Sequence, residues 1–397
     1  MKYLRIGTEY YKKVDKPCLD GSTHSEIIGW KKHTITDDHG KEVLKDIPKY
    51  EGYVVVPSHQ NYEQEIGGFY NKYKILSHDL NVRFDPKKIV KTLEFLEHVF
   101  GEQYDIGLDY LSILWKYPTQ ILPILCVVSE ERNTGKTTFL NWLKLVFEGN
   151  MTINKNEDFR SRFNSDWSEK LIIAIDEVLL DKREDSERIK NLSTAASYKT
   201  EAKGKDKVES SFFGKFILCS NNETNFILID RNEIRYWVRK IPVLGLNDPN
   251  LMDKLVEELP YVVKYISERK VVSPKKSRMW FTKSQLYTEA LDKLVNGTKF
   301  YAEKELILIL EEMFEDFETD TICLSIGDIG EEFVKSNYKI SRGAIRQILD
   351  RWKLKSINSS YNWYYKSLIP HSNEYQFEKQ NKKGRFYTFE KEFIKNC

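Results

Sequence analysis

Residues 127–147 read VVSEERNTGKTTFLNWLKLVF. An apolar run breaks into a polar loop that ends in Gly135-Lys136-Thr137, and apolar residues then return at helical spacing. A loop that binds a polyphosphate needs backbone N–H groups around the phosphates, a lysine that reaches the outer oxygens and a hydroxyl that binds Mg²⁺. The loop meets all three needs. The candidate ATP-binding residues are Arg132, Asn133, Thr134, Gly135, Lys136, Thr137 and Thr138.

The helix that begins near Lys136 would direct its positive dipole end at a bound anion. Its buried stripe is predicted to comprise Phe139, Leu140, Leu143, Val146 and Phe147. The loop departs from the usual pattern at Glu130, where a glycine normally stands. A carboxylate near a polyphosphate is unfavourable, so we expect Glu130 to point away.

The composition is that of a soluble globular protein. The 397 residues suggest two or three compact units, and a net charge of +2 means that any nucleic-acid affinity must come from local patches. The five cysteines lack paired spacing, which argues against a disulfide framework or a structural zinc and favours a cytoplasmic location. Without a signal peptide or a run of about 18 apolar residues, we expect no membrane partner.

Two further apolar runs end in polar side chains, which is where an open α/β sheet holds its ligands. The run LIIAIDEVLL, residues 171–180, ends in Asp176 and Glu177. Asp176 would hold Mg²⁺ through water and Glu177 would polarise an attacking water. The run KFILCSNN, residues 215–222, ends near Asn221, which could contact the γ-phosphate or position the water. The alternative for the carboxylates is a solvated strand end.

Between these runs the sequence predicts a β-hairpin with Gly204 at its tip. Such a hairpin can contact nucleic-acid phosphates, although its lysines could also serve only to keep it soluble. The basic residues around the tip are Lys199, Lys203, Lys205 and Lys207.

Three arginines follow the third run, at the entry to one more apolar strand: Arg231, Arg235 and Arg239. Arginine suits the charge that develops in phosphoryl transfer, because its guanidinium is planar and always ionised. A structural arginine in a salt bridge is the alternative for each.

The remaining chain is predicted to be mostly helical up to residue 314, with a helix over residues 249–270 that is kinked or split at Pro260. The tail then has a winged-helix pattern, in which Ser341 caps a helix that places Arg342 and Arg346 on its outer face. Residues 321–397 carry 14 Lys and Arg against 8 Asp and Glu, which favours a nucleic-acid partner. A protein-docking module is the alternative.

The order and spacing of these pieces resemble the superfamily 3 helicases of viruses and mobile elements, a branch of the AAA+ ATPases, and within them the phage primase-helicase family. The resemblance covers roughly residues 80–245, and the tail more weakly. It is carried by the stretches LDYLSILWKYPTQILPILCVVSEERNTGKTTFLNWL, FNSDWSEKLIIAIDE, IKNLSTAA and FFGKFILCSNN.

The resemblance implies a fold and a set of units. The fold class is α/β, with an AAA+ P-loop ATPase core, an N-terminal helical region and a C-terminal winged-helix domain. The expected units are a small region of unknown role (1–80), a helical collar (81–119), the ATPase core (120–245), a helical lid and linker (246–315) and the winged-helix domain (316–397).

The resemblance also implies roles. Lys136 and Thr137 would contact phosphate and metal, and Asp176 would make the second metal contact. Glu177 would be the base and Asn221 the sensor. The DNA-binding residues would be Lys203, Lys205, Lys207, Arg342 and Arg346. Arg235 best matches an arginine finger, with Arg231 and Arg239 as alternatives, and the finger would act in trans across a ring, usually a hexamer.

Three hypotheses follow. The first is a Mg²⁺-dependent ATPase ring that translocates 3′ to 5′ on single-stranded DNA and unwinds forked duplex, in a bacterial host cytoplasm. Its first 80 residues lack an acidic primase or polymerase constellation, so priming would need a separate primase or polymerase. The second is an ATP-dependent initiator or loader that binds DNA without processive unwinding. The third, a degenerate ATPase, conflicts with the presence of Lys136, Asp176 and Glu177 together.

Overall fold

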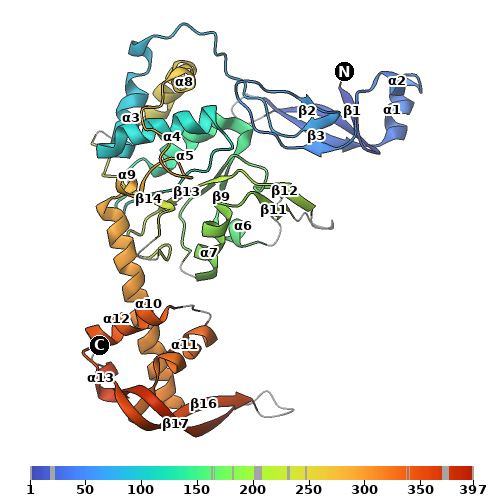
Figure 1. The fold of residues 1–397 in the computed structure, drawn as a ribbon. Coiled ribbons are helices and arrows are strands. Elements are labelled where there is room, and N and C mark those ends of the chain that lie inside the picture. Colours follow the sequence, from blue (N-terminus) through green and yellow to red (C-terminus); the bar gives the residue numbers. More distant parts are fainter. Residues whose placement is uncertain are drawn as a thin grey trace.

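The computed structural model describes residues 2–17, 23–161, 164, 166–180, 183–200, 208–229, 233–245, 248–336, 338, 340–368 and 375–395. The chain has a mixed α/β fold. N-terminal strands extend from one side of a central parallel sheet, helices cover both faces of that sheet, and a C-terminal unit lies at the end of a long helix (Figure 1).

The central sheet has five parallel strands in the order β14-β8-β13-β10-β9. Its side chains alternate between two cores, because successive residues of a strand point to opposite faces. In β8, Leu125 and Val127 join one cluster, whereas Cys126 and Val128 join the other. The strands are β8 (Ile124–Val128), β9 (Met151–Asn154), β10 (Ile172–Ile175), β13 (Lys215–Ser220) and β14 (Tyr236–Lys240).

The first face of the sheet is covered by α5 (Lys136–Phe147), which packs with α3 (Val90–Phe100), α4 (Tyr104–Lys116) and α8 (Leu251–Glu268). The predicted apolar stripe of α5 is fully buried, as expected. The expected split at Pro260 is wrong, since α8 runs on through this residue. Val262, Val263 and Ile266 hold that half of the helix in the core, which offsets the backbone hydrogen bond that proline removes.

The second face carries shorter elements: α6 (Asn156–Arg160), α7 (Arg183–Leu192), the hairpin β11 (Ser197–Thr200) and β12 (Val208–Ser211), and the start of α10 (Glu289–Asp316). The predicted hairpin is therefore present, as an antiparallel pair in which Lys199 opposes Glu209. Its tip, with Lys203, Lys205 and Lys207, lies outside the described residues.

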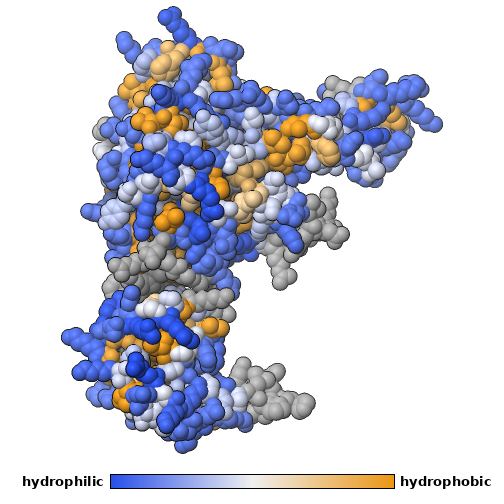
Figure 2. Space-filling view, in the orientation of Figure 1, coloured by the Kyte–Doolittle hydropathy of each residue, from blue (hydrophilic) through white to orange (hydrophobic). Residues whose placement is uncertain are grey.

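The N-terminal part consists of two small sheets. The first, β3-β2-β1-β4, comprises β1 (Tyr3–Ile6), β2 (Glu9–Pro17), β3 (Thr23–Trp30) and β4 (Lys49–Tyr50), with α1 (Lys32–His39) and α2 (Val43–Asp46) beside it. The second comprises β5 (Tyr53–Val54), β6 (Glu65–Ile66) and β7 (Phe69–Asn71). Leu4 and Ile6 of β1 pack with Tyr70 of β7 between the two sheets, and hydrophobic surface is visible on this N-terminal part (Figure 2).

The C-terminal unit is built around the second half of α10. Leu306, Leu310 and Phe314 of this helix enter the same apolar cluster as Ile345 and Phe389. The unit contains β15 (Thr321–Leu324), α11 (Ile326–Lys335), α12 (Arg342–Arg351), β16 (Ile357–Leu368), β17 (Tyr375–Glu390) and α13 (Lys391–Lys395), and its sheet order is β15-β17-β16.

Short elements complete the described chain: η1 (Pro86–Lys88), η2 (Gly101–Gln103), η3 (Glu148–Asn150) and α9 (Lys283–Leu286). Among the described residues, every helix is too short or too polar to cross a membrane.

Candidate functional site

The loop between β8 and α5 enters the helix through a glycine in the left-handed region. Gly135, at the N-cap of α5, has a φ of 88°, which favours glycine. A Cβ atom at this position would lie 3.0 Å from the ring of Phe95. The loop is also anchored from outside, because Leu244 donates its N–H to the carbonyl of Asn133 at 3.0 Å. The N–H groups at the start of α5 therefore have a fixed direction.

Lys136 lies under this loop. Its ammonium donates to the carbonyl of Ser129 and to the hydroxyl of Thr134, both at 3.1 Å. Burial lowers the pKa of Lys136 from its ordinary value, although nearby groups that include Asp176 and Glu223 oppose the shift. All these contacts are to neutral oxygens, so phosphate oxygens would be stronger acceptors for the same ammonium.

Thr137 and Asp176 meet at the carboxyl ends of the strands. The Thr137 hydroxyl lies 3.4 Å from Asp176 Oδ2. The strand ends are locked in register, since Ser129 donates its N–H to the carbonyl of Ser220, and the Ser220 hydroxyl donates to the carbonyl of Val178 at 2.9 Å. The hydroxyl and the carboxylate are oxygen donors of the kind that Mg²⁺ prefers.

This donor pair fits magnesium in a phosphate site. Mg²⁺ in such sites is held by one or two carboxylates, waters and substrate phosphates, and needs no all-protein cage. The part of the chain that the structure describes holds no cluster of three or more His, Cys, Asp or Glu side chains suited to a metal. Thr137 and Asp176 are thus the residues that could hold the ion.

Glu177 and Asn221 lie at the same edge with exposed side chains. Glu177 has a φ of 53° and donates its N–H to Asp176 Oδ1 at 3.0 Å. Asn222, two residues after the end of β13, shapes a turn by accepting the N–H groups of Thr224 and Asn225. Asn221 makes no side-chain hydrogen bond with any residue that the structure describes, so its amide can reach a ligand.

Glu223 is a buried carboxylate beside the loop that the sequence did not identify. Only 2% of it is exposed, and it accepts the N–H of Glu130 at 3.1 Å and pairs with Lys240 and Lys293 at 3.0 and 2.8 Å. Burial alone would raise its pKa, but the lysines and the N–H lower the pKa of Glu223 to about 2. Its partners lie far away along the chain, so no local pattern could have indicated it.

Glu130, which replaces the usual loop glycine, has a partner. Its side chain is 61% exposed and lies 3.8 Å from the ammonium of Lys293. The ion pair directs the carboxylate toward α10.

The arginine candidates separate clearly. Arg239 is buried and forms two hydrogen bonds to the Glu102 carboxylate, at 2.5 and 3.0 Å. Arg235 lies at the amino ends of the strands, whereas the loop lies at their carboxyl ends. Its carbonyl accepts the N–H of Ile124, and its side chain pairs with Glu233 at 2.8 Å. The length of β8, roughly 13 Å, separates Arg235 from its own loop. Arg231 lies outside the described residues.

Arg342 and Arg346 lie on the exposed face of α12. Ser341 caps this helix by accepting the N–H of Ala344, as the sequence predicts. Neither arginine forms an ion pair within the described parts of the chain, whereas Arg351 pairs with Glu303 at 2.9 Å. The first turns of α12 thus present unneutralised positive charge.

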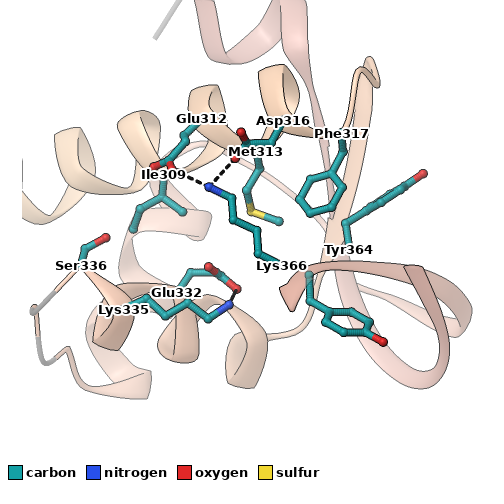
Figure 3. A pocket seen from close by; sticks show the side chains of 11 residues that line it. Ile309, Glu312, Met313, Asp316, Phe317, Glu332, Lys335, Ser336, Tyr364 and Lys366 are labelled. Carbon is teal, nitrogen blue, oxygen red and sulfur yellow. Dashed lines mark hydrogen bonds and ion pairs between the residues drawn. The ribbon is translucent and has the colours of Figure 1, made fainter. Parts of the chain in front are cut away.

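A pocket of about 480 Å³ lies between α10, α11 and the β16–β17 hairpin. Figure 3 shows Lys366 of β16 reaching Glu312 and Asp316 of α10, at 2.7 and 2.5 Å. Met313 and Phe317 lie beside it. These ion pairs fix the hairpin to the long helix.

Comparisons with known proteins agree with the fold. A model for a family of unknown function (DUF5906) matches residues 127–236. No curated protein matches the sequence significantly. The apo structure of the NrS-1 C-terminal region overlaps with a TM-score of 0.58 over 97% of this chain and 95% of that chain, at 16% identity. Its A form gives a TM-score of 0.57 over 96% and 93%, at 17% identity.

A structure of JCV helicase with a bound small molecule overlaps far less, with a TM-score of 0.33 over 65% of this chain and 67% of that chain, at 10% identity. That overlap is too weak to support an argument. The NrS-1 likeness spans nearly the whole of both chains, so the two proteins share their overall arrangement.

Proposed function

We propose that the chain is a Mg²⁺-dependent ATPase that acts as a DNA helicase of the superfamily 3 type. The observation that carries the proposal is the junction of Lys136, Thr137 and Asp176 at the carboxyl edge of a parallel sheet. A buried lysine on a glycine-containing loop, followed by a hydroxyl beside a carboxylate, suits a nucleoside triphosphate with its metal.

Each residue has a role in the proposed reaction. Lys136 would exchange its contacts with loop oxygens for phosphate oxygens, and Thr137 and Asp176 would hold Mg²⁺. The bound ion would neutralise charge on the phosphates. Glu177 would orient and deprotonate the attacking water, and Asn221 would position it. Glu223 lies outside this set and would act by holding the loop.

The proposed particle is a ring, a hexamer by resemblance, in which Arg235 acts on the neighbouring copy. The position of Arg235 at the amino end of β14 supports this, because from there its side chain cannot reach the loop of its own chain. Such a head-to-tail contact closes into a ring when the rotation allows it.

The proposed substrate is single-stranded DNA within forked duplex. Lys203, Lys205 and Lys207 on the β11–β12 hairpin would contact the strand. The C-terminal unit would act as a winged helix, with Arg342 and Arg346 contacting DNA phosphates. A separate primase or polymerase would then supply priming, in a bacterial host cytoplasm.

The test combines ATP turnover with strand displacement on a forked substrate. Wild type should hydrolyse ATP with Mg²⁺, respond to single-stranded DNA and separate the strands. Lys136→Ala should abolish both activities, while Lys41→Gln, an exposed change in the N-terminal part, should leave them intact. Absence of ATP hydrolysis by the wild type would refute the ATPase.

The second candidate is an initiator or loader that binds DNA in an ATP-dependent way without processive unwinding. The exposed charge of α12 favours it, because a duplex-binding unit serves an initiator as well as a helicase. ATP-dependent DNA binding without strand displacement would select this candidate over the first.

A further inference from the structure

A second cleft lies on the other side of the core, between the N-terminal strands and the edge of the central sheet near β9 and β10. Its volume is about 550 Å³, within the range of ligand sites. Its lining is far from the phosphate loop in the fold, since Lys170 lies just before the amino end of β10.

Tyrosines form the N-terminal wall of the cleft. Tyr53 and Tyr70 pack edge to face with centroids 6.2 Å apart, and the Lys72 ammonium covers the Tyr53 ring at 4.5 Å. Tyr62 is partly exposed and has no ring partner among the described residues. Tyr62 packs against the main core cluster, so the part of its ring that remains exposed is what can accept a flat partner from solvent.

The cleft is also basic on both of its sides, since Lys13 and Lys72 belong to the N-terminal part and Lys170 precedes β10. Four lysines line it against two carboxylates: Lys13, Lys72, Lys74 and Lys170 against Glu26 and Glu169. Glu169 is already occupied by Lys72 at 3.1 Å. Lys170 donates to the carbonyl of Gly149 at 2.7 Å, a neutral acceptor.

On the core side of the cleft, the ammonium groups of Lys74, Lys144 and Lys170 lie close enough to repel one another. Burial, and then the nearby ammonium groups of Lys170 and Lys74, lower the pKa of Lys144 to about 8. Burial and Lys74 likewise lower the pKa of Lys170. An anion in the cleft would relieve this repulsion.

The cleft is rigidly framed. Asn71 is 2% exposed and holds the Tyr62 loop, since its side chain accepts the N–H of Val56 and donates to the carbonyls of Val56 and Glu63, all within 3.1 Å. Asn150 holds Lys74 from the core side through two backbone hydrogen bonds. Preorganised walls of this kind lower the cost of binding.

The segment that precedes β10 links the cleft to the β11–β12 hairpin. The segment that supplies Glu169 and Lys170 also contains Asn164, whose amide donates to the carbonyl of Lys199 at 3.0 Å. Trp167 of the same segment stacks on Tyr198 with centroids 5.9 Å apart. A chain lying in the cleft would thus lead toward the hairpin.

We propose that this cleft binds single-stranded nucleic acid, with a base stacked on Tyr62 and the phosphates held by Lys13 and Lys170. Aromatic rings beside a basic groove are the general solution for binding strands without sequence preference. The site needs neither nucleotide nor the phosphate loop, so it stands apart from the proposed ATPase.

The test measures binding of fluorescein-labelled oligothymidylate by anisotropy, in EDTA and without nucleotide. Tyr62→Leu should weaken binding at least about five-fold, whereas Tyr62→Phe, which keeps the ring, should bind like wild type. Lys13→Gln should weaken binding and reduce the salt slope by about 0.7, the value for one contact with a single strand. Lys41→Gln, exposed in the same N-terminal part, is the matched control.

Two further arms separate the occupants. An abasic oligonucleotide should bind more weakly than oligothymidylate, since it offers phosphates without bases. Photo-crosslinking with 4-thiothymidine should label the peptide that contains Tyr62, in wild type and equally in Lys136→Ala. Unchanged binding by both Tyr62→Leu and Lys13→Gln, equal binding of the abasic strand, or crosslinks confined to other segments would overturn the proposal, whatever the outcome for ATP hydrolysis.

Discussion

The Glu223 carboxylate lies 2.8 Å from the Lys293 ammonium and also accepts the backbone N–H of Glu130 at 3.1 Å. One buried side chain therefore joins the start of the phosphate loop to the helix that leads to the C-terminal unit. A nucleotide that shifts the loop would act on α10 through this contact, which gives the two parts a physical connection.

Glu223→Gln should destabilise the protein by about 1–3 kcal/mol, because it removes a charge from two lysines and weakens the hold on Glu130. The pKa of Glu223 in the fold, about 2, lies below its ordinary value of 4.5. The contribution is therefore fully present above about pH 4.5 and is lost as the pH falls toward 2.

Urea unfolding of wild type and Glu223→Gln at pH 7 and about pH 4 checks this. Glu289→Gln is the control, since Glu289 is an exposed glutamate on α10, the helix that carries Lys293. Equal free energies of unfolding for wild type and Glu223→Gln at pH 7 would contradict it.

Because the Thr137 hydroxyl lies beside Asp176, two substitutions of Thr137 should differ in their effect on ATP turnover. Thr137→Ser keeps the hydroxyl and should retain ATP turnover within about ten-fold, whereas Thr137→Ala should lose about 10²-fold or more and require more Mg²⁺. Steady-state turnover across a Mg²⁺ titration measures both. Similar Mg²⁺ dependence in the two variants would remove Thr137 from the metal site.

The sequence indicates β8, β10 and β13 because strands buried on both faces are continuous apolar runs. It does not indicate β9, whose four residues MTIN are short and lie at the sheet edge, nor β15. In the N-terminal part, β5 and β6 have only two residues each and carry almost no periodic signal, whereas β2 and β3 are longer.

The candidate site divides in the same way. Lys136, Thr137 and Asp176 follow from local motifs at strand ends. Glu223 does not, because its meaning depends on Glu130 and Lys293, which lie 93 and 70 residues away along the chain. Similarly, spacing alone could not separate Arg239 from Arg235, because only the fold pairs Arg239 with Glu102.

Lys215 predicts a rise of stability with pH. It is buried, donates to the carbonyls of Phe213 and Pro118, and burial lowers its pKa from 10.5 to about 7. Folding thus disfavours its charged form, so its penalty is full below about pH 7 and disappears as the pH rises toward 10.5.

The free energy of unfolding of wild type should therefore rise, relative to that of Lys215→Met, by up to about 1.4 kcal/mol per pH unit above pH 7. Unfolding by urea at about pH 7 and about pH 9 measures the change, and Lys283→Met, at an exposed lysine, should show none. A constant difference between Lys215→Met and wild type would contradict the buried neutral amine.

The α12 arginines predict a change in salt dependence. Arg342→Ala with Arg346→Ala should weaken duplex binding and reduce the slope of log affinity against log salt by about 1.8, the value for two phosphate contacts. Lys335→Ala is the control, because Lys335 lies on α11 and is paired with Glu332 at 2.6 Å. Filter binding over a salt series decides it, and an unchanged slope would favour a protein-docking role.

Arg235 and Lys136 lie at opposite ends of the strands of one sheet. The proposed ring therefore predicts complementation between two inactive variants. Arg235→Ala and Lys136→Ala should each lose about 10³-fold or more of ATP turnover. Mixed together, about a quarter of the sites should regain a complete set, with the loop from the first variant and Arg235 from the second. Arg239→Ala should instead lower the free energy of unfolding, because it removes a buried side chain that bonds to Glu102 and Gln103. Turnover that does not recover on mixing, in particles shown to exchange subunits, would rule out an arginine finger at Arg235.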